Sequence, residues 1–161
     1  MVPVRVKSAL VFAIGVIILH VITYYFAGII AQVILNAHQY YPPSPTAISS
    51  LRDPMSAYVQ VRIVPAQVLR GVVFAIALYP FRRRIMELGQ YYGGLAVTGV
   101  IFLLGEVAGT GGLIEHYVYY IAVPSGFVLV TFVEVLLQTL IFGQLLLLWE
   151  KRFNRVFYAD M

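Results

Sequence analysis

Four long runs of apolar residues, separated by short polar segments, dominate this 161-residue chain. A helix needs about 20 consecutive apolar residues to cross the hydrocarbon core of a bilayer, and each run approaches or exceeds that length. The sequence therefore predicts an all-α integral membrane protein, a four-helix transmembrane bundle built as one domain over residues 1–161. The predicted spans cover residues 9–35, 54–79, 91–110 and 125–149.

The composition supports the same class of protein. Hydrophobic residues make up 61% of the chain and charged residues only 11%, whereas charged residues are about a quarter of a soluble domain. The absence of cysteine excludes disulfides, thiolate metal sites and cysteine nucleophiles. The net charge of +4 comes from clusters that flank the apolar runs, so we predict membrane lipids and no nucleic acid as partners.

The boundaries of the first two spans have local signals. Arg5 and Lys7 precede the first run as in a signal peptide, but that run is too long for one, so we expect an uncleaved span. Asp53 followed by Pro54 predicts the N-cap and first turn of the second span. Pro65 predicts a bend inside that span, and Pro80 should end or kink it.

The distribution of basic residues predicts the orientation of the chain. In a four-span arrangement most of them fall on one side of the membrane, which should be the cytoplasmic side, so both termini are expected to be cytoplasmic. We therefore predict a multi-pass protein of the cell membrane, of the cytoplasmic, inner-membrane type. The residues expected on the cytoplasmic side are Arg5, Lys7, Arg82, Arg83, Arg84, Lys151, Arg152 and Arg155.

Two polar segments are expected as outer loops. Residues 36–52 are rich in proline, and Thr46 to Leu51 are expected to form a short interfacial helix. The second loop, residues 111–123, carries Glu115 and His116, which we interpret as solvated loop residues.

Ionisable residues inside the apolar runs are the main candidates for a functional site. Counting inward from the ends of the spans places His20, Arg70, Glu106 and Glu134 near a common depth. A charge at the centre of a bilayer costs at least about 2.5–3.5 kcal/mol, and arginine cannot lose its proton. We therefore predict that Arg70 contacts Glu134, with Glu106 as the alternative partner.

Polar neighbours at helical spacing extend this candidate site. Gln67 lies three residues before Arg70, and Gln138 lies four residues after Glu134. Gly105 and Gly109 form a G-x-x-x-G pattern beside Glu106, which allows close helix approach. The predicted ligand-binding or polar cluster consists of His20, Gln67, Arg70, Glu106, Glu134 and Gln138.

Structural interpretations compete with the functional ones. The arginine–glutamate pair could act only as a packing lock, His20 could be a hydrogen-bonded core residue, and Arg82–Arg84 could serve as an orientation signal that contacts lipid headgroups. Imidazole and carboxylate suit zinc or iron. However, the sequence has no paired histidines at i, i+4, and Arg70 would oppose a cation, so no metal and no cofactor are predicted.

Three classes of function fit these observations. The simplest is a non-catalytic accessory or assembly subunit whose partners are other membrane protein subunits. The second is an intramembrane site that binds, or transforms by acid–base chemistry, a lipid-soluble or anionic molecule, with Glu106 as the acid and Glu134 as the base. The third is a proton or ion pathway, which requires self-association because one four-helix bundle is too narrow for a pore. A cavity that reaches Arg70 and Glu106 favours the second hypothesis.

Overall fold

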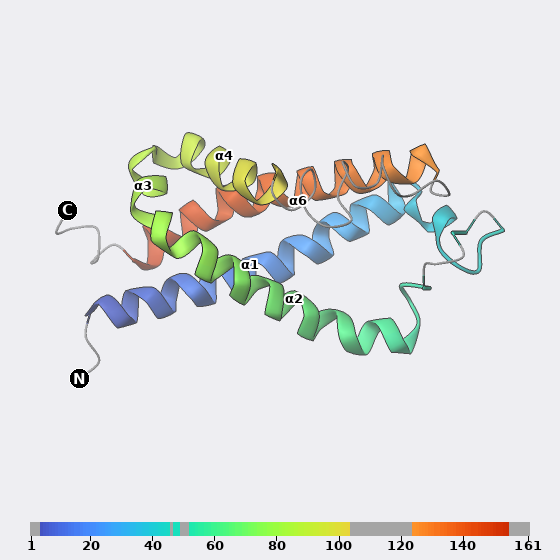
Figure 1. Cartoon of the computed structure of the whole chain (residues 1–161), viewed down its shortest axis with the longest axis horizontal. Helices are drawn as coiled ribbons and strands as arrows, with labels where there is room; N and C mark the ends of the chain where they lie inside the picture. Colours follow the sequence, from blue (N-terminus) through green and yellow to red (C-terminus); the bar gives the residue numbers. More distant parts are fainter. Residues whose placement is uncertain (1–3, 46, 49–51, 104–123, 155–161) are drawn as a thin grey trace.

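The computed structural model describes residues 4–45, 47–48, 52–103 and 124–154, and these residues form helices joined by short turns. The elements are α1 (Val4–Val33), η1 (Ala37–Tyr40), α2 (Ala57–Leu78), η2 (Tyr79–Phe81), α3 (Arg82–Glu87), α4 (Gly89–Phe102) and α6 (Ser125–Phe153). The four longer helices, α1, α2, α4 and α6, pack together and supply the core residues (Figure 1).

Helices α1 and α6 lie side by side at the centre of the molecule. Helix α2 packs against α1, and α4 packs against α6. Successive long helices run in opposite directions, so the start of α1, the end of α6 and the short helix α3 lie at the same end of the molecule, while η1 lies at the other (Figure 1). We call these the α3 end and the η1 end. The cytoplasmic location of the termini stays a prediction.

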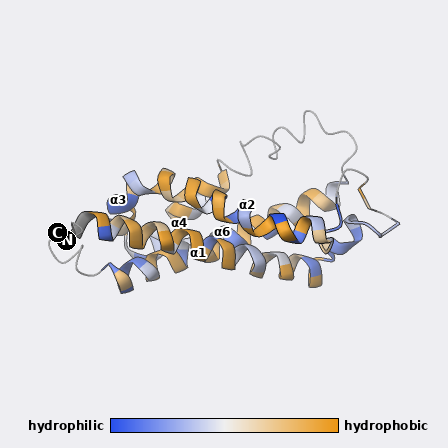
Figure 2. Cartoon of the chain, turned by 90° about the horizontal axis from the view of Figure 1, so that it is seen from below, coloured by the Kyte–Doolittle hydropathy of each residue, from blue (hydrophilic) through white to orange (hydrophobic). Residues whose placement is uncertain are grey.

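Three helical segments are long and apolar enough to cross a membrane. They are Val6–Val33, Ala57–Glu87 and Ser125–Phe153, which correspond to the first, second and fourth predicted spans. Hydrophobic residues cover most of the length of these helices (Figure 2). The described part of the third predicted span is the 14-residue helix α4, and its remainder lies outside the described residues. The count of four spans therefore stays a prediction.

The start of α2 differs from the sequence prediction. The N-cap is Ser56, whose side chain accepts a hydrogen bond from the Val59 backbone N–H, and the helix begins three residues later than expected. Asp53 instead accepts a bond of 2.8 Å from the backbone N–H of Met55, and its carbonyl accepts one from the Ser56 hydroxyl. Asp53 thus forms the turn that places Ser56 at the N-cap. Aspartate and serine are both common N-cap residues, so the sequence alone did not distinguish between them.

The two prolines Pro65, inside the second predicted span, and Pro80, just after it, have different effects. Helix α2 continues through Pro65 without interruption. Pro80 lies in the 3₁₀ turn η2, where α2 ends and α3 begins, as the sequence predicted. The chain then reverses into α4 at Gly89, whose φ of +78° is a conformation that glycine adopts without a Cβ clash.

Each long helix buries one narrow stripe, and the rest of its surface is half-buried or exposed, as expected for helices that face lipid. Their stripes meet in a core near the α3 end, and this core contains residues from all four long helices. The stripe on α2, for example, is Gln67, Gly71, Ala75 and Leu78, spaced three or four residues apart. The core residues are Phe12, Val16, Ala75, Leu78, Val97, Phe142 and Leu146.

Small residues set the distance between α4 and α6. A Cβ atom added to Gly143 would lie 2.4 Å from the Gly94 carbonyl oxygen, so only glycine fits there. Thr98 bridges the same contact by donating a hydrogen bond of 3.0 Å to the Thr139 carbonyl. Close approach through small residues is common between membrane helices. The predicted site of such close approach, the G-x-x-x-G pattern of Gly105 and Gly109, lies outside the described residues.

Candidate functional site

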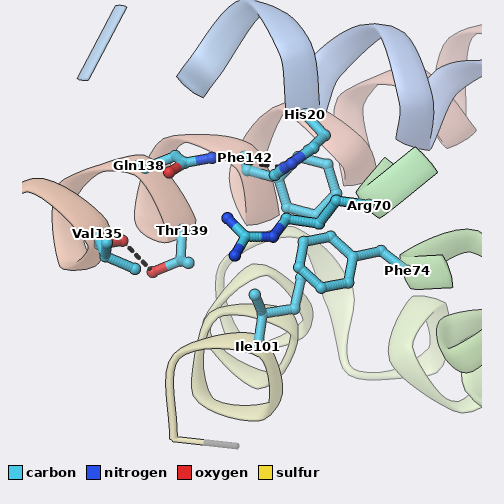
Figure 3. Close-up of a pocket in the computed structure, with 8 residues that line it drawn as sticks. All are labelled: His20, Arg70, Phe74, Ile101, Val135, Gln138, Thr139 and Phe142. Carbon is cyan, nitrogen blue, oxygen red and sulfur yellow. Dashed lines mark hydrogen bonds between the residues drawn. The ribbon is translucent and has the colours of Figure 1, made fainter. Parts of the chain in front are cut away.

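A cavity of about 120 Å³ lies among α1, α2, α4 and α6, midway along the long helices. Figure 3 shows that the polar side chains at this cavity come from α1, α2 and α6, while α4 contributes one apolar side chain. Its lining consists of His20, Arg70, Phe74, Ile101, Val135, Gln138, Thr139 and Phe142. The structure therefore brings three of the six predicted site residues, His20, Arg70 and Gln138, to one space.

His20 is held between two glutamines on neighbouring helices. Its Nε2 atom lies 3.0 Å from Gln67 Oε1, and its Nδ1 atom lies 3.4 Å from Gln138 Nε2. An amide oxygen accepts and an amide nitrogen donates, so Nε2–H donates to Gln67 and Nδ1 accepts from Gln138. This arrangement matches the neutral imidazole and uses both ring nitrogens. The imidazole ring also packs edge to face with the Phe74 ring, and the two ring centroids are 4.9 Å apart. These contacts fix the position of His20 in the lining of the cavity.

Arg70 has an unusual position for a charged residue in an apolar span. It lies about 20 Å along the helix from Ala57 and about 12 Å from Leu78, at about 1.5 Å per residue. Its side chain extends from α2 toward Gln138 and Thr139 of α6 (Figure 3). Arg70 falls beside the buried stripe of α2, between Gln67 and Gly71, and remains exposed.

The predicted contact between Arg70 and Glu134 is wrong. Within the part of the chain that the structure describes, Arg70 forms no ion pair and no hydrogen bond. The reason is geometric. Arg70 extends toward the level of Gln138 and Thr139, whereas Glu134 lies one helical turn away on α6, opposite Gly28 of α1.

Glu134 belongs to a separate group of residues nearer the η1 end. A Cβ atom on Gly28 would lie 3.6 Å from Glu134 Oε1. Burial, together with the negative charge of Glu134, raises the pKa of the Tyr41 phenol, so this tyrosine stays neutral at physiological pH. Glu106, the alternative partner predicted for Arg70, lies outside the described residues, as do the loop residues Glu115 and His116.

A buried ion pair does exist, but between residues that the sequence analysis did not join. Arg82 Nε donates to Glu150 Oε2 at 2.5 Å, and the two side chains are only 5% and 1% exposed. Asn154 donates a second bond of 2.6 Å to Glu150 Oε1, and the Arg82 guanidinium lies over the Phe12 ring at 5.2 Å. The burial of the Arg82 side chain contradicts the predicted contact with lipid headgroups, while its role as an orientation signal stays a prediction.

Helical spacing was the signal that could have found this pair. Arg82 follows Leu78 by four residues and so continues the buried stripe of α2. Glu150 follows Leu146 and Leu147 by four and three residues, on the buried stripe of α6. Arg83 and Arg84, by contrast, are exposed and pair with Glu87 on the surface of α3.

The cavity offers mainly hydrogen-bond donors. The Arg70 guanidinium has five N–H groups, and Gln138 has one amide proton besides the one directed at His20. Thr139 donates its hydroxyl proton back to its own helix, at 2.9 Å from the Val135 carbonyl. A positive charge and unused donors in a space walled by Phe74, Ile101 and Phe142 suit an anionic group joined to an apolar one.

Several cavity residues were not predicted from the sequence. Thr139 and Phe142 lie on the buried stripe of α6 next to Gln138, so the stripe itself was an available signal. Ile101 resembles any other apolar residue of its helix, and no sequence signal marks it. No protein-family model, curated protein or solved structure matches this chain. The geometry of the site therefore carries the functional argument.

Proposed function

We propose that this chain is a multi-pass membrane protein that binds an anionic group in the cavity formed by His20, Arg70, Gln138 and Thr139. One observation carries the proposal: the Arg70 guanidinium extends into a cavity midway along an apolar helix, with no acceptor among the described residues. A permanent charge at this depth is costly, and such residues usually face a cavity and mark a binding site. An anion in the cavity would offset that cost.

Binding is favoured over acid–base catalysis by the placement of the candidate groups. Glu134 does not line the cavity, and both ring nitrogens of His20 are engaged with glutamine side chains. A general base needs a free lone pair within hydrogen-bond reach of the substrate. The described lining therefore supplies recognition of charge and shape, and no proton acceptor of suitable basicity.

The accessory-subunit hypothesis would use the same arginine differently. A carboxylate on a helix of another membrane protein would then pair with Arg70, which is exposed on α2. The cavity favours a small ligand instead, because the guanidinium extends toward residues of the same chain and the space of about 120 Å³ lies among four of its helices.

The test compares three forms of the protein purified from membranes in mild detergent. Small molecules and lipids retained by the wild type, by Arg70→Gln and by Arg62→Gln are extracted and identified by mass spectrometry. Arg62 is the matched control, since it lies on the same helix but stacks on Tyr58, away from the cavity.

We expect an acidic molecule in the wild type and in Arg62→Gln, reduced at least tenfold in Arg70→Gln. Equal retention by all three forms would overturn the proposal. A stoichiometric polypeptide that is lost only from Arg70→Gln would replace it with the accessory-subunit function.

A further inference from the structure

Among the residues that the structure describes, none closes one side of the cavity at Arg70. Arg70 lines it and yet is exposed, as are its neighbours Leu69, at 66%, and Val73, at 54%. Among the four long helices, the pairs that pack most extensively in the described part of the chain are α1 with α2, α1 with α6 and α4 with α6. Helices α2 and α4 both reach the cavity, through Phe74 and Ile101, without packing along each other.

The opening between α2 and α4 would face the bilayer. Both helices expose apolar side chains along their length, and α2 belongs to a segment apolar enough to cross a membrane. A ligand that enters midway along such a helix therefore comes from the hydrocarbon region. Phe74 and Ile101 form apolar sides for this opening, while the charge of Arg70 lies inside it.

The volume of the cavity limits what it can enclose. A cavity of about 150 Å³ holds a benzene molecule, and this one, at about 120 Å³, is smaller. It has room for an acid group and a few carbon atoms. The remainder of a longer ligand must extend through the opening, between apolar side chains and toward lipid.

The position of the cavity midway along the helices favours one kind of acid group. A charged group is driven to neutralise when it leaves water for an apolar medium. A carboxylic acid can do so by taking up a proton, and it can then reach the middle of the bilayer, whereas the phosphodiester of a phospholipid keeps its charge and stays at the surface. A carboxyl group also matches the two-pronged geometry of a guanidinium.

We propose that the cavity receives the carboxyl group of a single-chain, membrane-dissolved carboxylic acid, whose hydrocarbon chain leaves between Phe74 and Ile101. This inference rests on the proposed function, because it names the class of ligand for the same site. On binding, the acid releases its proton to water, its carboxylate accepts hydrogen bonds from Arg70 and Gln138, and the chain replaces lipid contacts along α2 and α4.

The experiment measures equilibrium binding of radiolabelled palmitate to the protein in nanodiscs, with butyrate and palmityl alcohol as competitors. Butyrate has the acid group without the long chain, and palmityl alcohol has the chain without the acid. The variants are Arg70→Gln, Ile101→Trp, which fills the opening, and Val100→Trp. Val100 is the matched control, because it is exposed on the same helix and does not line the cavity.

We expect palmitate to compete at least tenfold better than either butyrate or palmityl alcohol. Ile101→Trp should weaken palmitate binding at least tenfold, and Val100→Trp should leave it unchanged. If palmitate and butyrate bind equally well and Arg70→Gln removes both, the long-chain ligand is wrong while the anion site stands. If Arg70→Gln changes the binding of neither acid, the anion site itself fails.

Discussion

Two of the arginines in the second helical segment, Arg70 and Arg82, have opposite environments. Arg82 is buried near the α3 end, bonded to a carboxylate that is itself bonded to Asn154. Arg70 lies 12 residues earlier, beside a cavity, and forms no ion pair within the described chain. A buried pair fixes the relative position of two helices, whereas a charge beside a cavity remains available to a ligand. The same residue type is therefore structural at one level of the molecule and a candidate binding group at another.

The largest effect on stability should follow loss of the buried pair. We expect Arg82→Leu to lower the free energy of unfolding by about 3–5 kcal/mol, because the buried Glu150 carboxylate would lose its bond to the Arg82 guanidinium. Unfolding in mixed micelles, titrated with a denaturing detergent, measures the change. The double variant Arg82→Leu with Glu150→Leu should recover most of the loss.

Arg83→Leu is the matched control for this comparison, since Arg83 is the next residue and pairs with the exposed Glu87. It should change stability little, because exposed pairs are screened by solvent. Equal stability of the Arg82 and Arg83 variants would show that the buried pair contributes no more to the free energy of unfolding than the exposed pair does.

The contact between α4 and α6 should show the next largest effect. Gly143→Ala places a methyl group 2.4 Å from the Gly94 carbonyl oxygen, so the helices must separate, at a cost of about 1–3 kcal/mol. Gly99→Ala on α4 meets nothing within 4 Å and should leave stability unchanged or raise it, since alanine favours helix. Thermal unfolding of both variants in detergent checks the prediction, and destabilisation by Gly99→Ala alone would contradict it.

Replacement of His20 tests how much its two hydrogen bonds in the lining of the cavity contribute to stability. His20→Phe leaves the side chains of Gln67 and Gln138 without their partner on α1. We expect a loss of about 1–2 kcal/mol, within the range for buried polar groups that lose one hydrogen bond, together with weaker ligand binding. His20→Asn, which can still donate and accept, should lose less stability than His20→Phe when both are unfolded side by side.

The smallest effect on stability should come from Arg70. We expect Arg70→Gln to change the free energy of unfolding by less than about 0.5 kcal/mol, or to raise it, because no described residue loses an ion pair. Retention of the acidic ligand should nevertheless fall. Unfolding and ligand retention measured on one preparation separate the two arginines: Arg82→Leu lowers stability first, and Arg70→Gln lowers binding. A stability loss for Arg70→Gln equal to that of Arg82→Leu would remove the distinction.

The sequence alone determined the helical class and the approximate positions of the long helices. Long apolar runs can satisfy their backbone hydrogen bonds only within themselves in lipid, so the predicted spans 54–79 and 125–149 lie close to α2 and α6. Local chemistry also placed the end of α2 at Pro80. The prediction of Asp53 as the N-cap of α2 was wrong. Two cap-type residues lie close together in the sequence there, and the N-cap is Ser56.

The tertiary structure decided which polar residues meet. Depth along a span can be counted from the sequence, and of the four residues that the count placed at one level, His20 and Arg70 line the same cavity whereas Glu134 does not. Rotation about each helix axis and the choice of neighbouring helix are set by packing, which a single apolar run does not encode. For that reason Glu134 faces Gly28 instead of Arg70, and Glu150 meets Arg82 from the far end of the chain. Small residues such as Gly94 and Gly143 allow α4 and α6 to approach closely, but only where these faces of the two helices meet.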